Sequence, residues 1–191
     1  MTTSTWSLFR SEPYRLLFPL AWLWGVVASW HWVALQLGWT QAYAPRYHGY
    51  LQTLGFGGGI AAGFLLTALP FFLAAAPAAM WELLLAVALV TGLGAAAIAD
   101  QLFFTLLCFF LLNALIGVFI LRRYNPRTGA PPPVTYIAWG LVHGLAGSAL
   151  AMLDPARAPL LGPRLVQLGF LLSLVLGIGS FLGARFLGTF Q

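Results

Sequence analysis

Long apolar stretches constrain this chain more than any other feature of its sequence. A bilayer core of about 30 Å needs about 20 apolar residues in each spanning helix, and several stretches meet or approach that length. We place the spans at residues 16–38, 48–70, 80–98, 102–121, 133–152 and 163–187. Prolines and charged residues separate them, among them Pro45, Pro70, Asp100 and Pro163, and proline cannot continue a helix without losing a hydrogen bond. The sequence therefore predicts an all-α protein, a bundle of six transmembrane helices.

The scarcity of charge excludes a soluble domain. Charged residues make up 7% of the 191 residues and hydrophobic residues 61%, with a mean hydropathy of +0.89. So few charges could not cover the surface of a globular domain. We therefore expect residues 1–191 to form a single transmembrane domain with the lipid bilayer around it. The net charge of +5 belongs to the loops between spans and does not indicate nucleic-acid binding.

Arginines in the short loops predict the orientation of the bundle. Cytoplasmic loops of membrane proteins carry an excess of positive charge. With the amino terminus inside, the cytoplasmic arginines are Arg10, Arg15, Arg122, Arg123, Arg127 and Arg185, and the outer ones are Arg46, Arg157 and Arg164. This excess predicts that both termini are cytoplasmic. The turn at Asp100 predicts an antiparallel hairpin of the third and fourth spans, and we expect Glu82 and Asp100 to be solvated at helix ends.

The second span carries a stripe of glycine. Gly55, Gly59 and Gly63 recur every four residues, so they share one face of a helix, and His48 and Gln52 continue that face toward the helix start. Small residues let helices approach closely in a membrane. Two interpretations stay open. The stripe is either a tight helix contact or one wall of a pocket in which Gly55 and Gly59 face a planar cofactor and His48 is its ligand.

The three histidines are the main candidate ligands, because ionisable groups inside a membrane are costly and rarely lack a role. On the predicted orientation, His31 of the first span and His143 of the fifth lie roughly 10 to 14 Å below the outer surface. Two neutral imidazoles at one depth could bind the iron of a low-spin haem b from opposite sides. His48 opens its span near the surface. For each histidine the alternative is structural, a hydrogen-bonded imidazole in the bundle or, for His48, a solvated one at the interface.

Other groups could complete such a site. Arg46, on the outer side, could pair with a haem propionate, although it could also be an ordinary loop charge. Imidazole does not select a metal by itself, so a third histidine could bind copper or be structural. The sequence contains no Ser-His-Asp arrangement, HExxH or CxxC. We therefore expect no catalysis by side chains, and any chemistry would be that of a cofactor.

The glycine-rich span resembles the second helix of the NnrS family, haem- and copper-containing bacterial membrane proteins linked to nitric-oxide metabolism. The matching residues are Gly55, Phe56 and the run Ala-Gly-Phe-Leu-Leu-Thr-Ala-Leu-Pro at 62–70. His48 falls on the first histidine of the family motif, whereas Tyr50 and Leu51 stand where the motif has a second histidine and a glutamate. Residues 13–23 and 176–188 also resemble the family.

This resemblance implies a haem-binding, multi-pass protein of the bacterial inner membrane with a role in the nitric-oxide response, respiration or denitrification. Because two polar groups of the motif are missing, copper is less expected than haem. Two other classes stay open. One is a non-haem accessory or assembly subunit of a larger respiratory membrane complex. The other is a small-solute or metal transporter, which is weaker because no predicted helix is clearly broken in mid-membrane.

The resemblance also implies an assembly, since family members have about twice as many helices as this chain. Two six-helix units in one membrane orientation are related by an axis along the membrane normal. We therefore predict a parallel homodimer, or a respiratory membrane-protein partner on the same surface, with Gly169, Ser173 and Gly177 as the candidate contact. The competing interpretation is that these small residues are used inside the monomer.

Overall fold

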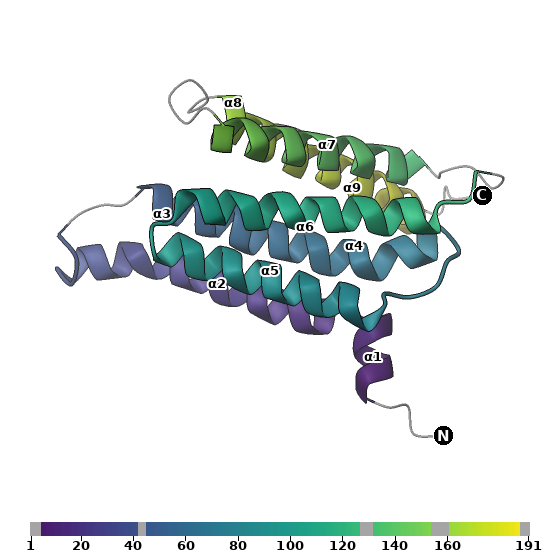
Figure 1. The fold of residues 1–191 in the computed structure, drawn as a ribbon, viewed down its shortest axis with the longest axis horizontal. Coiled ribbons are helices and arrows are strands. Elements are labelled where there is room, and N and C mark those ends of the chain that lie inside the picture. Colours follow the sequence, from purple (N-terminus) through teal and green to yellow (C-terminus); the bar gives the residue numbers. More distant parts are fainter. Residues whose placement is uncertain (1–4, 42–44, 127–131, 154–160, 188–191) are drawn as a thin grey trace.

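A computed structural model describes residues 5–41, 45–126, 132–153 and 161–187, and the regular structure in this part of the chain is helical. The elements are α1 (Thr5–Ser11), α2 (Tyr14–Gln36), α3 (Pro45–Tyr50), η1 (Leu51–Gly57), α4 (Gly58–Phe72), α5 (Met80–Ile98), α6 (Leu102–Arg123), α7 (Pro132–Leu153), α8 (Leu161–Arg164), η2 (Leu165–Leu171) and α9 (Leu172–Phe186). The long helices run side by side in one elongated bundle (Figure 1).

Six of the described helices are long and apolar enough to cross a membrane. They are Tyr14–Gln36, Tyr47–Phe72, Met80–Ile98, Leu102–Arg123, Pro133–Leu153 and Leu161–Ser180. Each lies within a few residues of a predicted span, so the predicted six-span, all-α fold is confirmed. The cytoplasmic placement of the termini stays a prediction.

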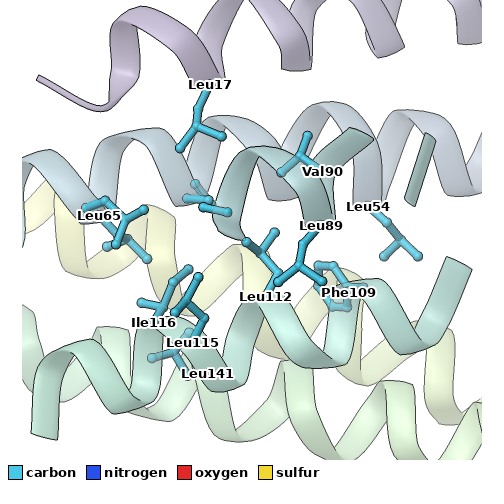
Figure 2. Packing of buried hydrophobic residues seen from close by; sticks show 14 of the residues in the cluster. Leu17, Leu54, Leu65, Leu89, Val90, Phe109, Leu112, Leu115, Ile116 and Leu141 are labelled. Carbon is cyan, nitrogen blue, oxygen red and sulfur yellow. The ribbon is translucent and has the colours of Figure 1, made fainter. Parts of the chain in front are cut away.

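The core lies around α6. In Figure 2, apolar side chains from α2, α4, α5, α6 and α7 converge between the helices. Leu65, Phe109 and Ile116 are at most 1% exposed. Figure 1 shows α6 between α7 and the pair formed by α2 and α5, and α6 packs on α4, α5 and α7. The fourth span is thus the helix that joins the two sides of the bundle.

The helices α5 and α6 form the predicted antiparallel hairpin. Asp100 closes its turn with a φ of 53°, in the left-handed region that aspartate tolerates better than most residues. The carboxylate of Glu82, which we expected to be solvated, is only 1% exposed. It accepts hydrogen bonds from Arg123 Nη2 at 2.7 Å, Arg122 Nη1 at 3.3 Å and the Ala79 amide at 2.7 Å. The hairpin causes this burial, because it brings the arginines at the end of α6 over the start of α5.

The glycine stripe of the second span packs tightly against α2. A methyl group added to Gly59 would stand 2.8 Å from Cβ of Ala21, and one added to Gly63 would stand 3.0 Å from Cβ of Leu17. Real side chains do not approach so closely, so only glycine permits this contact. Of the two interpretations of the stripe, the structure matches tight helix packing.

The small residues of the sixth span are also used inside the monomer. A methyl group on Gly169 would stand 2.6 Å from Cβ of His143, and one on Gly177 would stand 2.9 Å from Cβ of Tyr136. Both neighbours belong to α7, and Ser173 packs on the same helix beside Gly140. The predicted dimer contact through this stripe is therefore corrected, because α7 already covers it.

Two spans contain a π-helical segment that the sequence analysis did not predict. Residues Leu51–Gly57 form η1 within the second span, and Leu165–Leu171 form η2 within the sixth. A π-helical turn holds one residue more than an α-helical turn, and such turns occur frequently at functional sites. The two segments have related sequences, LQTLGFG and LVQLGFL.

These segments belong to an internal repeat. Gly25 of the first unit faces Phe56, and Gly144 of the second unit faces Phe170 in the same way. A methyl group added to Gly25 would stand 3.0 Å from Cδ2 of Phe56, and one added to Gly144 would stand 3.1 Å from Cδ2 of Phe170. Three further contacts of the first unit have an equivalent in the second, in the same order along the helices. In the first unit Gly55 contacts Trp24, Gly59 contacts Ala21 and Gly63 contacts Leu17. In the second unit Gly169 contacts His143, Ser173 contacts Gly140 and Gly177 contacts Tyr136. The first unit (α2 to α4) and the second unit (α7 to α9) therefore pack in the same way, with the α5–α6 hairpin between them in the chain.

The two units are related by a rotation whose axis passes near η1 and η2. Gly57 and Leu171 occupy equivalent positions in η1 and η2, and a methyl group on Gly57 would stand 3.5 Å from Cδ2 of Leu171. A residue meets its own equivalent where a rotation axis that relates the two units passes close to it. The first and fifth spans cross the membrane in the same direction, so this axis runs along the membrane normal.

Candidate functional site

The structure brings two of the three candidate histidines to one end of the bundle. His31 lies near the end of α2 and His48 lies in α3. The ring of His31 is 5.4 Å from that of Tyr47, and the ring of His48 is 5.6 Å from that of Trp32. The two histidines are thus beside each other's sequence neighbours.

A backbone hydrogen bond orients His48. Its Nδ1 lies 3.0 Å from the carbonyl oxygen of Ala28, an acceptor, so Nδ1 must carry the proton and donate it. The other ring nitrogen, Nε2, then keeps its lone pair. Metal-binding histidines are commonly fixed in this way, with one ring nitrogen bonded to a backbone carbonyl and the other bound to the metal. Ala28 is fully buried, so the imidazole is held from the protein interior.

His143 lies on the other unit. Its Nδ1 is 2.8 Å from the carbonyl oxygen of Trp139, one turn earlier in α7, and its side chain packs on Gly169 of η2. The helix α2 packs on α4, η1 and α5, whereas α7 packs on α6, η2 and α9. The structure therefore does not bring His31 and His143 face to face, and their role as a ligand pair stays a prediction.

The remaining predicted site residues are placed as follows. Trp24 and Ala21 of α2 occupy the space beside Gly55 and Gly59, which leaves no slot for a planar cofactor along this part of the stripe. Arg46 belongs to the first turn of α3, and its side chain lies outside what the structure describes. Among the described residues, no group of three or more His, Cys, Asp or Glu side chains could hold a metal ion. A haem needs only one or two protein ligands, so this last finding bears on copper more than on haem.

A cavity of about 240 Å³ lies at the same end, where the two units meet. Its lining comes from both units and from α6: Gly49, Tyr50, Thr53, Leu54, Leu106, Gly147, Ala151, Gly162, Pro163, Val166 and Gln167. Thr53 and Gln167 hold equivalent positions in η1 and η2, so corresponding parts of the two units contribute to the cavity. The wall is largely apolar, and Tyr50, Thr53 and Gln167 supply its polar groups.

Sequence reasoning missed this cavity, although one signal was available. The pattern Leu-x-x-Leu-Gly-Phe occurs at residues 51–56 and again at 165–170. A repeated pattern in two spans predicts two equivalent units, and sites often form between such units.

Comparison with known proteins identifies a family. The family model described as NnrS protein matches residues 8–189, nearly the whole chain. The comparisons of this chain with curated proteins and with solved structures found no match.

Proposed function

We propose that this chain, which belongs to the NnrS family, is a multi-pass membrane protein that acts in nitric-oxide metabolism by holding a b-type haem through His48. Family membership supports a general association with nitric oxide. The haem, its ligands and the link to respiration or denitrification are our inference. The observation that carries it is the hydrogen bond from His48 Nδ1 to the Ala28 carbonyl, which leaves Nε2 available to iron.

The residues around His48 fit a haem at the end of the bundle better than one inside it. The glycine stripe is filled by α2, whereas α3 and the end of α2 place two histidines near each other. His31 is therefore the second candidate ligand. Arg46, at the start of α3, is the candidate partner of a propionate. Bound haem iron would supply one-electron transfer or reversible binding of a diatomic gas.

In this proposal the protein's own groups do two things. The Ala28 carbonyl fixes the tautomer and the direction of the His48 ring, so the ligand is ready before iron binds. The edge of Trp32, whose ring lies at 74° to that of His48, covers the imidazole with apolar surface. Both effects limit rotation of the ring and the access of water to it.

The spectrum of the purified protein tests the proposal. We expect a Soret band and sharp α and β bands on reduction, and we expect His48→Ala to lose or convert them. His143→Ala is the matched control, because it removes the same group from the other unit and should leave the bands unchanged. A colourless, fully folded preparation contradicts the proposal. Loss of the bands in His31→Ala and His143→Ala, with His48→Ala unchanged, would restore the ligand pair predicted from the sequence.

A nitric-oxide role has its own test. Nitric oxide added to the reduced protein should shift the Soret band, and a strain that lacks the chain should grow more slowly than its parent under nitric-oxide stress. Normal growth of that strain under this stress, with no spectral shift, would contradict the role.

The cavity between the units favours one second candidate, a small-solute transporter. Sites of transporters often lie between structural repeats, at irregular segments of corresponding helices, and η1 and η2 are π-helical segments at corresponding positions. Uptake of labelled solutes by proteoliposomes tests this candidate. Uptake that Thr53→Leu reduces, because leucine would fill the cavity, supports it, and no uptake above that of empty liposomes contradicts it.

A further inference from the structure

An exposed groove runs along the first unit. It has a volume of about 270 Å³ and lies between Trp22, Val26, Trp30 and Val33 of α2 and Gln52 and Phe56 of η1; we call it the α2 groove. Three of the α2 side chains are more than half exposed, Trp22 at 59%, Val26 at 58% and Trp30 at 51%. The groove lies within the membrane-spanning part of the chain, so lipid or another helix must cover it.

The internal repeat shows what such a groove accepts. The equivalent groove of the second unit lies at Gly144 and Phe170, and α6 fills it. The ring of Phe109 is 5.3 Å from that of Phe170, and Asn113 Oδ1 lies 2.8 Å from the position of a methyl group on Gly144. The fourth span runs antiparallel to the fifth. In the second unit, the groove is therefore filled by α6, a transmembrane helix antiparallel to α7. In the first unit, no described helix occupies the equivalent position beside α2.

The α2 groove also contains a buried polar atom that a partner helix could satisfy. The Oε1 atom of Gln52 is buried and accepts no hydrogen bond from the described residues. An unsatisfied amide oxygen away from water is costly. In the second unit the equivalent position is the apolar Val166, which needs no partner. A helix in the α2 groove that brings a donor to Gln52 would remove this cost.

The repeat also identifies a surface beside the groove. In the second unit α6 packs on both α7 and α4, with Phe109 against Gly58. A helix in the α2 groove would by equivalence pack on α2 and on Leu172 of α9. Leu172 belongs to an exposed apolar row with Leu168, Val175 and Leu176, which are between 50% and 64% exposed. Spacings of three and four residues place this row on one face of the helix.

We propose that two copies of this chain form a parallel dimer in which Leu168 and Leu172 of each copy lie in the α2 groove of the other. All copies share one orientation in a membrane, so the sixth span of one copy is antiparallel to the first span of the other, as the occupied groove requires. The contact uses one surface on both copies, which is the condition for a closed twofold dimer.

The register of the contact follows from the fold. Trp24 is level with Gly55, whose equivalent is Gly169, and a twofold axis along the membrane normal keeps every residue at its own depth. Val26 of one copy should therefore lie level with Leu168 of the other. Leu176 lies about 12 Å deeper at 1.5 Å per residue.

Cross-linking between two tagged copies, co-produced in a Cys108→Ser background, tests the contact in membranes. We expect a short bis-maleimide to join a Val26→Cys copy to a Leu168→Cys copy, and not to a Leu176→Cys copy. A Val142→Cys copy is the matched control, because Val142 is 52% exposed on α7, away from the groove. The proposal is overturned if the Val26→Cys copy gives no cross-linked product with the Leu168→Cys copy, or an equal amount of product with the Val142→Cys copy. It is also overturned if the Val26→Cys copy is cross-linked only to another protein.

Native mass spectrometry gives an independent measurement. A bulky indole at position 26 should obstruct the groove, so Val26→Trp should weaken the dimer about tenfold or more, whereas Val142→Trp should not. Both positions are more than half exposed, so neither change disturbs the core. A wild-type monomer in mild detergent, or a dimer that Val26→Trp leaves intact, contradicts the proposal.

Discussion

The contact between Trp24 and Gly94 allows the packing argument to be tested with a single methyl group. Trp24 is 8% exposed, and its indole nitrogen donates a hydrogen bond to the Val90 carbonyl at 3.0 Å. A methyl group on Gly94 would stand 2.2 Å from Cε2 of this ring, far closer than any real contact. Gly94→Ala must therefore displace the indole and break its hydrogen bond.

The expected cost can be estimated from these contacts. Overpacking a core costs about 1 to 3 kcal/mol, and a lost hydrogen bond adds about 1 kcal/mol. Alanine in place of glycine within a helix returns about 1 kcal/mol. Gly94→Ala should therefore lower the free energy of unfolding by about 1 to 3 kcal/mol.

The same helix offers a matched control. A methyl group on Gly92 would meet Cys108 Sγ at 3.4 Å, an ordinary contact, so Gly92→Ala should keep the helix-propensity gain and be neutral or stabilising. Unfolding of both variants in increasing SDS, followed by tryptophan fluorescence, measures the difference. Trp24→Phe, which removes the larger ring, should recover part of the stability of Gly94→Ala. The reasoning is refuted if Gly94→Ala is as stable as Gly92→Ala.

Three further predictions concern the ends and faces of the bundle. Arg123→Ala should destabilise the protein by about 3 kcal/mol in the same SDS assay, because it leaves the buried Glu82 carboxylate without its closer partner. Arg122→Ala, at a half-exposed arginine, should cost about 1 kcal/mol or less. Equal costs of the two substitutions would contradict this prediction. Gly169→Leu should reduce the yield of folded protein in size-exclusion chromatography, because the leucine would collide with the imidazole of His143 on α7. Gly183→Leu, with nothing within 4 Å of the added methyl group, should not reduce it, and equal yields would contradict the prediction. Tags on both termini should be accessible only from the cytoplasm, and labelling of either from outside would contradict the arginine argument.

The spans could be predicted because their cause is local. A membrane helix needs about 20 apolar residues in sequence, and Pro45, Asp100 and Pro163 mark breaks that can be read directly. The π-helical segments could not be predicted in the same way. One additional residue in a turn leaves the apolar composition of a span unchanged, so neither η1 nor η2 alters the pattern from which the spans were read.

Contacts between spans were harder to predict, because they depend on which helices are neighbours. The depths of His31 and His143 could be estimated from the chain, but depth does not determine which side of the bundle a helix occupies. The burial of Glu82 depends on Arg123, which is distant in sequence and close only because α5 and α6 form a hairpin. The sequence left a tight helix contact and a cofactor pocket both open for the stripe of the second span, and it predicted a dimer contact for that of the sixth. The helices that fill both stripes became clear only from the fold.

The position of the cavity between two related units has a consequence for what it would recognise. A site on the axis of a true homodimer has identical walls and presents each chemical group twice. In a single chain that contains both units, the two walls can differ, and they do so here, with Thr53 in the first unit and Gln167 at the equivalent position of the second. A molecule in the cavity would meet the hydroxyl of Thr53 and the amide of Gln167, so its two ends would not be equivalent. A ligand bound in this cavity would therefore meet different groups on its two sides, which a symmetric pair of identical chains would not provide.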